Sequence, residues 1–551
     1  MASRRDELNA YSFARKRTNA AFLKPLPNGS IESAPRPLKA VVPSIVMGVL
    51  ILAGFGACGI IKPVAPKGWD TVGANVIVGD ESTTRYVVLN NTDANGNKQK
   101  LLHPILNLAS AKLLLDPDKF QVVKVKESEL DGKLPHGPAV GIPYAPDRLP
   151  TQQEVDKPKV WAICTRPGSG ENSKPQQAVF VLGGKDRQAI DDPKKGKLDL
   201  HQALYVEDPK GQRWLVDKDG MAFRFDSSVG GTVRPPQGVE KTDSDLQRII
   251  FGDSAEPQKV STDFMDTLVP SPVPIAMPRI QHAGQKTPVL GVPDKYRTIG
   301  TVLQANDSQQ KYVVVGDGVE KVSNFVAKLL LEGQNAYDLH QDGTALKPMD
   351  VSTTSVPLKK DDAGRGVTFM GKIPGSDIDM PWPTEVVSAA NNFKAGSQAG
   401  GLAGPTDKGV SCSVYKGTNT QLPGEANKKL GFPNGVPDMQ TWVGKDYPAK
   451  IAPGASSYVT PGNGLLYREA ATASATSGSM FLVTDTGLRY SIPANNDGGD
   501  KAGKADQEQG KSQLHLGYKS AHPPLILKTW SQLLPAGPSL DVQSARKPQS
   551  S

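Results

Sequence analysis

The hydrophobic pattern of residues 311–333, KYVVVGDGVEKVSNFVAKLLLEG, predicts a strand, a glycine turn and a helix. The run from Tyr312 to Val315 contains residue types that suit a packed, pleated surface, and Gly316-Asp317-Gly318 tolerates the positive φ of a tight turn. Ser323 is a candidate N-cap, and Gly333 is a candidate left-handed C-cap. A nucleotide-binding unit has the same order of strand, glycine turn and helix. This stretch, however, has no G-x-G-x-x-G motif and no acidic residue after a second strand. We therefore interpret it as a structural building block.

The same pattern occurs earlier in the chain. RYVV at 85–88 matches KYVV at 311–314, and AKLLL occurs at both 111–115 and 327–331. The first copy has a longer polar turn, at a place where loops tolerate insertions. The two stretches therefore indicate two copies of one strand-and-helix module.

A second pair of segments predicts two hairpins, RWLVDKDGMAFRF at 213–225 and MFLVTDTGLRYSI at 480–492. A related helical segment follows each, from 260 and from 526. The Asp-Gly turns have ordinary hairpin chemistry, and DKDG lacks the rest of an EF-hand calcium loop. The pattern predicts two tandem halves with two modules each, which share a core because a single module buries little by itself.

The chain has three cysteines, and two of them follow this symmetry. Cys164 in KVWAICTRP and Cys412 in GVSCSVYKG each lie on a β-like segment between the two modules of a half. Equivalent positions in related halves can meet across a pseudo-twofold axis, so we predict a Cys164–Cys412 disulfide in an extracytoplasmic domain. Closing so long a loop would contribute roughly 4–5 kcal/mol in the chain-entropy model. The alternative is two unpaired buried thiols.

Residues 40–61, AVVPSIVMGVLILAGFGACGII, contain no charge and predict one transmembrane helix with Pro43 in its first turn. A cleaved signal peptide fits less well, because the 39 residues before the apolar run and the run itself are longer than usual for one. A lipoprotein modified at Cys58 also fits less well, because FGA before Cys58 is an imperfect match to the expected lipoprotein motif. Residues 1–39 hold eight Lys or Arg and three acidic residues, a net charge of +5 within a chain of +8. The basic arm is therefore predicted to be cytoplasmic, with the large domain outside.

Aromatic residues lie between the basic residues of this arm. The arm can act as a topology signal that touches anionic lipid, or it can form a short helix that docks a cytoplasmic partner. The residues expected at such a contact are Arg4, Arg5, Tyr11, Phe13, Arg15 and Arg17.

Four stretches, in the same order, resemble the EccB family, the membrane-anchored B component of actinobacterial type VII secretion systems. They are RRDELNAYSFARKR, the apolar run, LLHPILNLASAKLL and PPLILKTWSQLLPAGPSLD, and the resemblance reaches about Asp541. It implies a single-pass inner-membrane protein with a cytoplasmic N-terminus and an extracytoplasmic domain of four repeat modules around a disulfide-bridged β core. The implied partners are an EccC-type FtsK-like ATPase, an EccD-type multispan protein, EccE, a mycosin protease and other EccB copies.

The predicted fold is α+β, with one transmembrane helix followed by four strand-helix modules around a pseudo-twofold central β core. The expected segments are a cytoplasmic arm (1–39), a transmembrane helix (40–61), module 1 (62–125), the first half of the core (126–205), module 2 (206–275), a core linker (276–300), module 3 (301–345), the second half of the core with mobile insertions (346–475), module 4 (476–541) and a disordered tail (542–551).

The EccB family carries an ATPase label, and ADQEQGKS nearly matches a P-loop, with Gly510, Lys511 and Ser512 at the right spacing. A P-loop lies between a buried strand and a helix. Here no apolar strand precedes the motif, and QLHLGYK follows in place of a clear helix. The histidines lack the spacing that metal ligands show in metal-binding motifs. The extracytoplasmic domain is only weakly basic, which argues against nucleic-acid binding. We expect no catalytic residue, cofactor or metal, and ATPase activity stays open.

Two functions fit these observations. The first is a structural membrane subunit that anchors a large extracytoplasmic domain to the type VII translocation channel. The second is an ATP-hydrolysing component of the same system. A weaker third is a cell-wall-binding module, because Gly- and Pro-rich repeat domains outside a membrane often hold polysaccharide.

Overall fold

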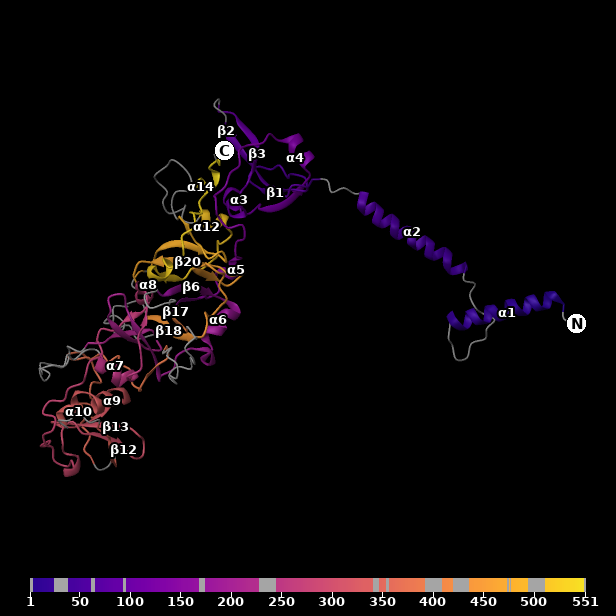
Figure 1. Cartoon of the computed structure of the whole chain (residues 1–551). Helices are drawn as coiled ribbons and strands as arrows, with labels where there is room; N and C mark the ends of the chain where they lie inside the picture. Colours follow the sequence, from indigo (N-terminus) through magenta and orange to yellow (C-terminus); the bar gives the residue numbers. More distant parts are fainter. Residues whose placement is uncertain are drawn as a thin grey trace. The chain divides into compact units, whose positions relative to one another are not determined.

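The computed structural model describes residues 3–23, 38–60, 65–92, 96–167, 174–226, 244–339, 346–352, 356–391, 409–419, 436–472, 475, 477–493 and 511–549. The chain divides into two compact units, residues 1–67 and 68–551. The first unit contains the helices α1 (Arg4–Leu23) and α2 (Leu38–Ile60), and the second contains every strand that the structure describes (Figure 1).

Helix α2 covers nearly all of residues 40–61, where the membrane crossing is predicted. It begins at Leu38, so Pro43 lies inside the helix and not in its first turn as expected. Proline at this position removes one backbone hydrogen bond, because it has no N–H. Within the described residues, no helix combines the length and apolar character that crossing a membrane requires. The crossing therefore stays a prediction.

Four sheets of the second unit share one strand order, with the first three strands antiparallel and the fourth parallel to the first. Sheet 1 has the order β3-β2-β1-β4, from β1 (Asn75–Gly79), β2 (Arg85–Thr92), β3 (Lys98–Pro104) and β4 (Gln121–Val125). Sheet 3 has the order β14-β13-β12-β15, from β12 (Val302–Ala305), β13 (Lys311–Val315), β14 (Gly318–Val322) and β15 (Met349–Val351).

Sheets 2 and 4 follow the same plan. Sheet 4 has the order β22-β21-β20-β23, from β20 (Leu465–Ala470), β21 (Ser479–Val483), β22 (Arg489–Ile492) and β23 (Leu525–Leu527). Sheet 2 is formed by β7 (Gln202–Glu207), β8 (Arg213–Val216), β9 (Met221–Arg224) and β10 (Gln258–Lys259), with β11 (Val269–Pro270) and β16 (Ser388–Ala389) added beside β9 and β7.

A helix lies between the third and fourth strands of each sheet: α3 (Leu108–Leu114), α7 (Ser244–Phe251), α9 (Asn324–Glu332) and α12 (Lys511–His515). A parallel fourth strand needs such a crossover, because the chain must return to the end of the sheet where it started. The other connections contain α4 (Glu127–Lys133), α5 (Gln152–Val155), α6 (Gly184–Asp191), η2 (Pro193–Lys195), α8 (Thr262–Asp266), η3 (Asp294–Tyr296), α10 (Gln334–Leu339), α13 (Lys528–Ser531) and α14 (Val542–Arg546). That the four sheets are copies of one repeat module stays a prediction.

The repeated sequence patterns fall at equivalent places in these sheets. RYVV lies in β2 and KYVV in β13, the second strand of each sheet, and the two AKLLL segments lie in α3 and α9 with Leu115 as the C-cap of α3. The predicted hairpins are β8–β9 and β21–β22. These element predictions are confirmed.

The predicted module boundaries cut through three of the sheets. β7 begins at Gln202, before the expected start at 206, β15 lies after 345, and β20 lies before 476. The sequence repeats mark second strands, hairpins and helices, whereas first and fourth strands have no shared pattern that marks them.

The stretch 311–333 differs from its prediction in two details. β14 lies between the glycine turn and the helix. Ser323 is the N-cap of α9, since its side chain accepts a hydrogen bond from the Val326 N–H at 3.1 Å. Gly333 is the C-cap, but its φ of −104° is not left-handed. A side chain at Gly333 would collide with the carbonyl oxygen of Leu329 and come within 2.8 Å of Met277 Sδ, so close packing requires the glycine.

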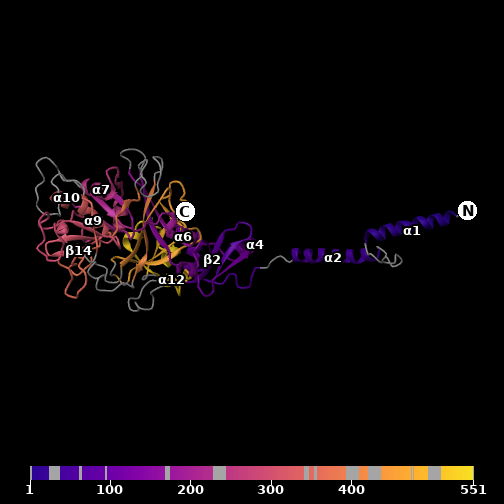
Figure 2. The same ribbon diagram turned by 90° about the horizontal axis from the view of Figure 1, so that it is seen from below.

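The outer sheets form two pairs, each with a shared core. Val87 of sheet 1 packs with Leu482 and Tyr490 of sheet 4. In both views of the chain, α12 and the residues of sheet 1 lie side by side, and α12 and α14 contact α3 (Figure 2). Phe223 of sheet 2 packs in the same way with Val313 of sheet 3.

The central sheet lies between these pairs. Its order is β18-β17-β5-β6-β19, from β5 (Val160–Arg166), β6 (Gln176–Leu182), β17 (Val410–Asn419), β18 (Val436–Gly444) and β19 (Ser457–Val459). The hairpins β5–β6 and β17–β18 meet antiparallel along β5 and β17, as a pseudo-twofold arrangement requires. One face packs Trp161 and Tyr415 against Val206 of sheet 2 and Tyr467 of sheet 4.

The predicted tail at 542–551 is not disordered over its described residues. Asp541 caps α14 by accepting the Ser544 N–H at 2.7 Å, and Ala545 is fully buried. The Gln549 N–H donates to the carbonyl of Ala139 at 2.8 Å. The prediction failed because the buried positions are single residues among polar ones. The insertions are predicted at 392–409, 470–479 and 493–513. Most of the first and third, and part of the second, lie outside the described residues.

The Asp217–Gly220 turn joins sheet 2 to the central sheet. Thr441 of β18 donates its N–H to the carbonyl of Lys218 at 3.0 Å and its Oγ1–H to the carbonyl of Asp217 at 2.9 Å. The Asp217 carboxylate accepts the N–H groups of Asp219 and Met221, both at 2.9 Å. Burial raises the pKa of Asp217 to about 6, although the hydrogen bond from Met221 acts in the opposite direction.

We predict that Asp217→Asn stabilises the chain at pH 7. The folded state binds the Asp217 proton more tightly than the unfolded state, so the free energy of unfolding falls as pH rises from about 4 to about 6. Asparagine keeps an oxygen that accepts the two backbone N–H groups but has no carboxyl proton. It therefore removes this loss of stability, which is on the order of 3 kcal/mol at most. Denaturant unfolding at pH 4 and pH 7 measures the difference, with a substitution of the exposed Asp219, Asp219→Asn, as the control. An equal effect at both pH values would contradict the prediction.

Candidate functional site

Cys164 and Cys412 form the predicted disulfide. They lie directly opposite each other on β5 and β17, with an S–S distance of 2.04 Å and a Cα–Cα distance of 4.1 Å. Both side chains are fully buried in a cluster with Phe180 and Val414, on the face of the central sheet opposite Trp161. The bond joins residues 248 positions apart and therefore covalently links the two halves.

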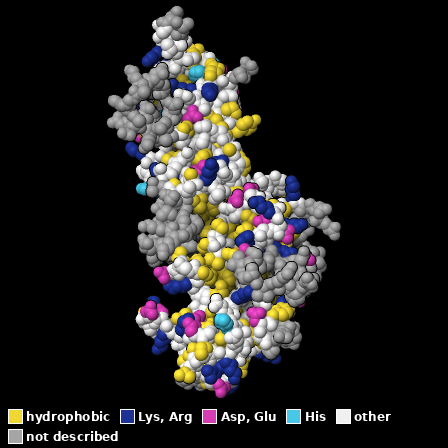
Figure 3. All heavy atoms as spheres, turned by 90° about the vertical axis from the view of Figure 1, so that its left-hand side faces the viewer, with side chains coloured by type: hydrophobic (Ala, Val, Ile, Leu, Met, Phe, Trp, Pro, Cys, Tyr) yellow, Lys and Arg dark blue, Asp and Glu magenta, His cyan; other side chains and the backbone are white. Residues whose placement is uncertain are grey.

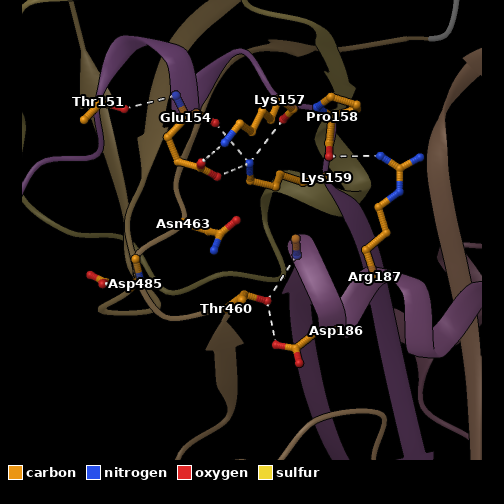
Figure 4. A network of polar contacts seen from close by, with 12 residues as sticks. Thr151, Glu154, Lys157, Pro158, Lys159, Asp186, Arg187, Thr460, Asn463 and Asp485 are labelled. Carbon is orange, nitrogen blue, oxygen red and sulfur yellow. Dashed lines mark hydrogen bonds and ion pairs between the residues drawn. The ribbon is translucent and has the colours of Figure 1, made fainter.

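A polar pocket of about 950 Å³ lies beside this sheet, where α5, α6 and the loop after β19 meet (Figure 4). Acidic and basic side chains both line it, together with two amides: Glu154, Asp191 and Asp192, Lys157, Lys159 and Arg187, and Gln188 and Asn463. In size it is comparable to small-molecule sites. Within the described chain, no group of three or more His, Cys, Asp or Glu residues is arranged to hold a metal ion.

Lys159 is the buried centre of this pocket, with only 1% of its side chain exposed. Its Nζ donates to Glu154 Oε1 at 2.8 Å, to the Glu154 carbonyl at 3.0 Å and to the Lys157 carbonyl at 3.2 Å. Burial lowers the pKa of Lys159, against the pull of Glu154. Burial also acts to raise the pKa of Glu154, but hydrogen bonds from Lys157 and Lys159 outweigh it and lower that pKa. All three ammonium protons of Lys159 therefore have acceptors. We call Lys159 and Glu154 the Lys159 clamp, because their bonds hold α5 to the start of β5 and leave no free ammonium proton.

Hydrogen bonds also fix the opposite wall of the pocket. Asp186 of α6 accepts from Tyr458 Oη and Thr460 Oγ1, both at 2.8 Å, and Thr460 Oγ1 accepts the Gly183 N–H at 3.1 Å. Burial, followed by this bond to Asp186, raises the pKa of Tyr458 to about 12. A side chain at Gly183 would collide with Asn463. The sequence carried no signal for this network beyond a lysine just before an apolar strand.

The P-loop-like residues do not form a described phosphate site. Gly510 and the residues that lead into the motif lie outside the described residues. Lys511 and Ser512 are the first residues of α12, so a short helix of five residues begins within the motif, where no clear helix was expected. Ser512 is fully buried, and α12 packs on α3 with His515 Nδ1 2.7 Å from the carbonyl of Leu115. Magnesium-phosphate chemistry needs an accessible hydroxyl at this position.

The six residues predicted to contact a partner all lie on α1, a helix of 20 residues. Arg4, Tyr11 and Arg15 follow helical spacing and share one face, because residues three, four and seven apart lie on one side. Phe13 and Arg17 lie on another face. The rings of Tyr11 and Phe13 are exposed.

Comparison with known proteins gives the family. The profile described as "Type VII secretion system ESX-1, transport TM domain B" matches residues 1–549. The chain belongs to the EccB family of type VII secretion proteins. A relative named "ESX-2 secretion system ATPase EccB2" from Mycobacterium tuberculosis is 26% identical over 504 residues, 89% of this chain and 86% of the relative. "ESX-3 secretion system ATPase EccB3" from Mycolicibacterium smegmatis is 27% identical over 470 residues, 84% of this chain and 77% of the relative.

Solved structures share the fold. The "Structure of EccB3 dimer from the ESX-3 core complex" aligns with a TM-score of 0.51 at 21% identity, over 86% of this chain and 99% of that chain. The "Structure of the periplasmic assembly from the ESX-5 inner membrane complex" gives 0.51 at 18% identity, over 88% and 99%. The second unit is therefore similar in fold to EccB periplasmic domains.

We predict that replacing Cys164 and Cys412 with alanine lowers the free energy of unfolding by about 2–5 kcal/mol, because the unfolded chain loses its long cross-link. Denaturant unfolding measures the loss, and wild type in reductant should show a similar shift. Cys58→Ala is the matched control and should leave the midpoint unchanged. Two extra free thiols in non-reduced, denatured wild type would contradict the bond.

We predict that Lys159→Met destabilises the chain by about 2–4 kcal/mol, because the carboxylate and two carbonyl oxygens lose a buried cation. Lys157→Met is the matched control: Lys157 also bonds Glu154, at 2.8 Å, but its side chain is 66% exposed, so about 0–1 kcal/mol is expected. If Lys159→Met and Lys157→Met shifted the unfolding midpoint equally, the burial of Lys159 would not be the reason for its contribution to stability.

Proposed function

We propose that the chain is a structural membrane subunit of a type VII secretion machine. The observation that carries the proposal is the family match over residues 1–549. In this arrangement residues 40–61 cross the inner membrane once, the basic arm 1–39 is cytoplasmic and the second unit is extracytoplasmic. The buried Cys164–Cys412 disulfide supports this side for the second unit, since such bonds persist in oxidising compartments.

The proposed partners are those expected of the family: an EccC-type FtsK-like ATPase, an EccD-type multispan protein, EccE, a mycosin protease and further copies of the chain. Similar structures are titled as a dimer and as an inner membrane complex, which supports assembly with copies and with other components. The exposed face of α1 that carries Arg4, Tyr11 and Arg15 is the proposed cytoplasmic contact. Aromatic and arginine side chains are the types enriched at binding hot spots.

The names of the relatives include the word ATPase, and the geometry of this chain favours a structural role over that activity. Ser512 is buried, and the clamp around Lys159 offers its ammonium no free donor for a phosphate. Ser512 and the Lys159 ammonium are both buried and contribute to the fold. We therefore propose that ATP hydrolysis belongs to the FtsK-like partner.

We predict that tagged full-length chain, extracted from membranes in mild detergent, co-purifies with an FtsK-like ATPase and a multispan protein. Tyr11→Ala with Arg15→Ala should reduce recovery of the ATPase about tenfold, as expected when a hot spot is removed. Asn9→Ala with Lys16→Ala, on a different face of α1, is the control and should retain it. Migration of the unaltered chain as a lone monomer or dimer would overturn the proposed function.

A further inference from the structure

Tyr144 is an exposed aromatic side chain held in a strained backbone conformation. The residue is 88% exposed and has a φ of +63°. Left-handed φ is unusual for a bulky residue and persists only where the surrounding structure enforces it. A side chain this exposed gains little packing in return, so the strain must be supported by the neighbouring residues.

The loop around Tyr144, residues 140–147, is tied to α3 on both sides of the ring. Ile142 donates its N–H to Ser110 Oγ at 2.8 Å, and its carbonyl accepts from Asn107 Nδ2 at 2.7 Å. Asp147 accepts the Leu108 N–H at 2.9 Å. The ring is therefore presented by a rigid backbone, which reduces the entropy that a contact would otherwise cost.

The same chain carries an apolar pocket of about 220 Å³, here called the Trp530 pocket. It is formed by the segment from α8 to β11, the start of β18 and helix α13, with Leu268, Val269, Met439, Leu527 and Trp530 in its lining. Asp266, Lys528 and Thr529 add polar groups. Hydrophobic side chains gather in a hollow on this side of the second unit, the side on which Figure 1 labels α8 (Figure 3).

The size and lining of the Trp530 pocket suit one aromatic ring. An apolar cavity of about 150 Å³ is enough to hold benzene, whereas small-molecule sites usually measure about 300–1,000 Å³. The polar residues of the pocket supply partners for a hydroxyl, which a buried tyrosine needs. Within one chain the Tyr144 ring is exposed, so it does not fill the pocket of its own copy.

We infer that Tyr144 of one copy inserts into the Trp530 pocket of a second copy of this chain. A rigid exposed ring and a pocket of matching size and chemistry lie on the same molecule. If a two-fold axis relates the two copies, the contact is made twice. The inference rests on the proposed function, in which several copies assemble, and it names the surface through which they do so.

A photo-crosslinking experiment tests the contact. Full-length chains with two different tags are co-expressed and kept in their membranes, and one carries p-benzoylphenylalanine at position 144. The expected product contains both tags, and its crosslinked peptides come from residues 266–270, 437–439 or 527–530. The matched control has the photo-reactive residue at Tyr337, which is also exposed, and should give no such product. Ala471→Trp, which fills the pocket, should reduce the product about tenfold, and Tyr144→Ala should weaken co-purification of the two tags to a similar extent.

A crosslink that maps to another surface of the second copy, or to a different protein, overturns the inference. So does the absence of a two-tag product when the FtsK-like ATPase and multispan protein still co-purify, and in that case the proposed function stands. Loss of those partners from the unaltered chain overturns the proposed function itself. The presence of the Cys164–Cys412 bond in each variant, read from its non-reduced mass, shows that the variant is folded.

Discussion

Strands β5 and β17 lie side by side with Cys164 opposite Cys412, and the rest of the second unit is built on this pairing. The two cysteines come from different halves of the chain, so each half contributes one hairpin to a single sheet. A slip of one residue would send every side chain of the strand to the other face. It would move Trp161 and Tyr415 out of the core that they share with sheets 2 and 4. The covalent bond excludes that slip.

Polar contacts then hold sheet 2 and helix α5 to this centre. The backbone of the Asp217–Gly220 turn bonds Thr441 of β18, and the Lys159–Glu154 pair ties α5 to the start of β5. Both use buried charged groups, which cost free energy unless their hydrogen bonds are satisfied. Apolar packing between sheets is tolerant of small shifts in position, whereas these bonds are directional. They therefore define how sheet 2 and α5 sit on the central sheet.

The same features fit a structural role. Three described groups that could carry chemistry are engaged in holding the fold: Cys164 and Cys412 in a disulfide, the Lys159 ammonium by three acceptors, and Ser512 in a buried helix start. The exposed aromatic residues of the described chain, in contrast, lie on α1, at Tyr144 and at Tyr337. A protein whose reactive groups are buried and whose aromatic rings are presented to solvent is suited to assembly with partners.

Local patterns in the sequence predicted the elements that repeat: the second strands with Tyr86 and Tyr312, the AKLLL helices, the Asp-Gly hairpins, and from their symmetry the Cys164–Cys412 bond. These follow from β-branched runs, helical periodicity and turn chemistry, which act between neighbouring residues. The first and fourth strands, the ordered α14, the conformation of Gly333 and the Trp530 pocket depend on residues far apart in the chain. Their conformation and burial are set by what packs against them, and only the tertiary structure brings those residues together.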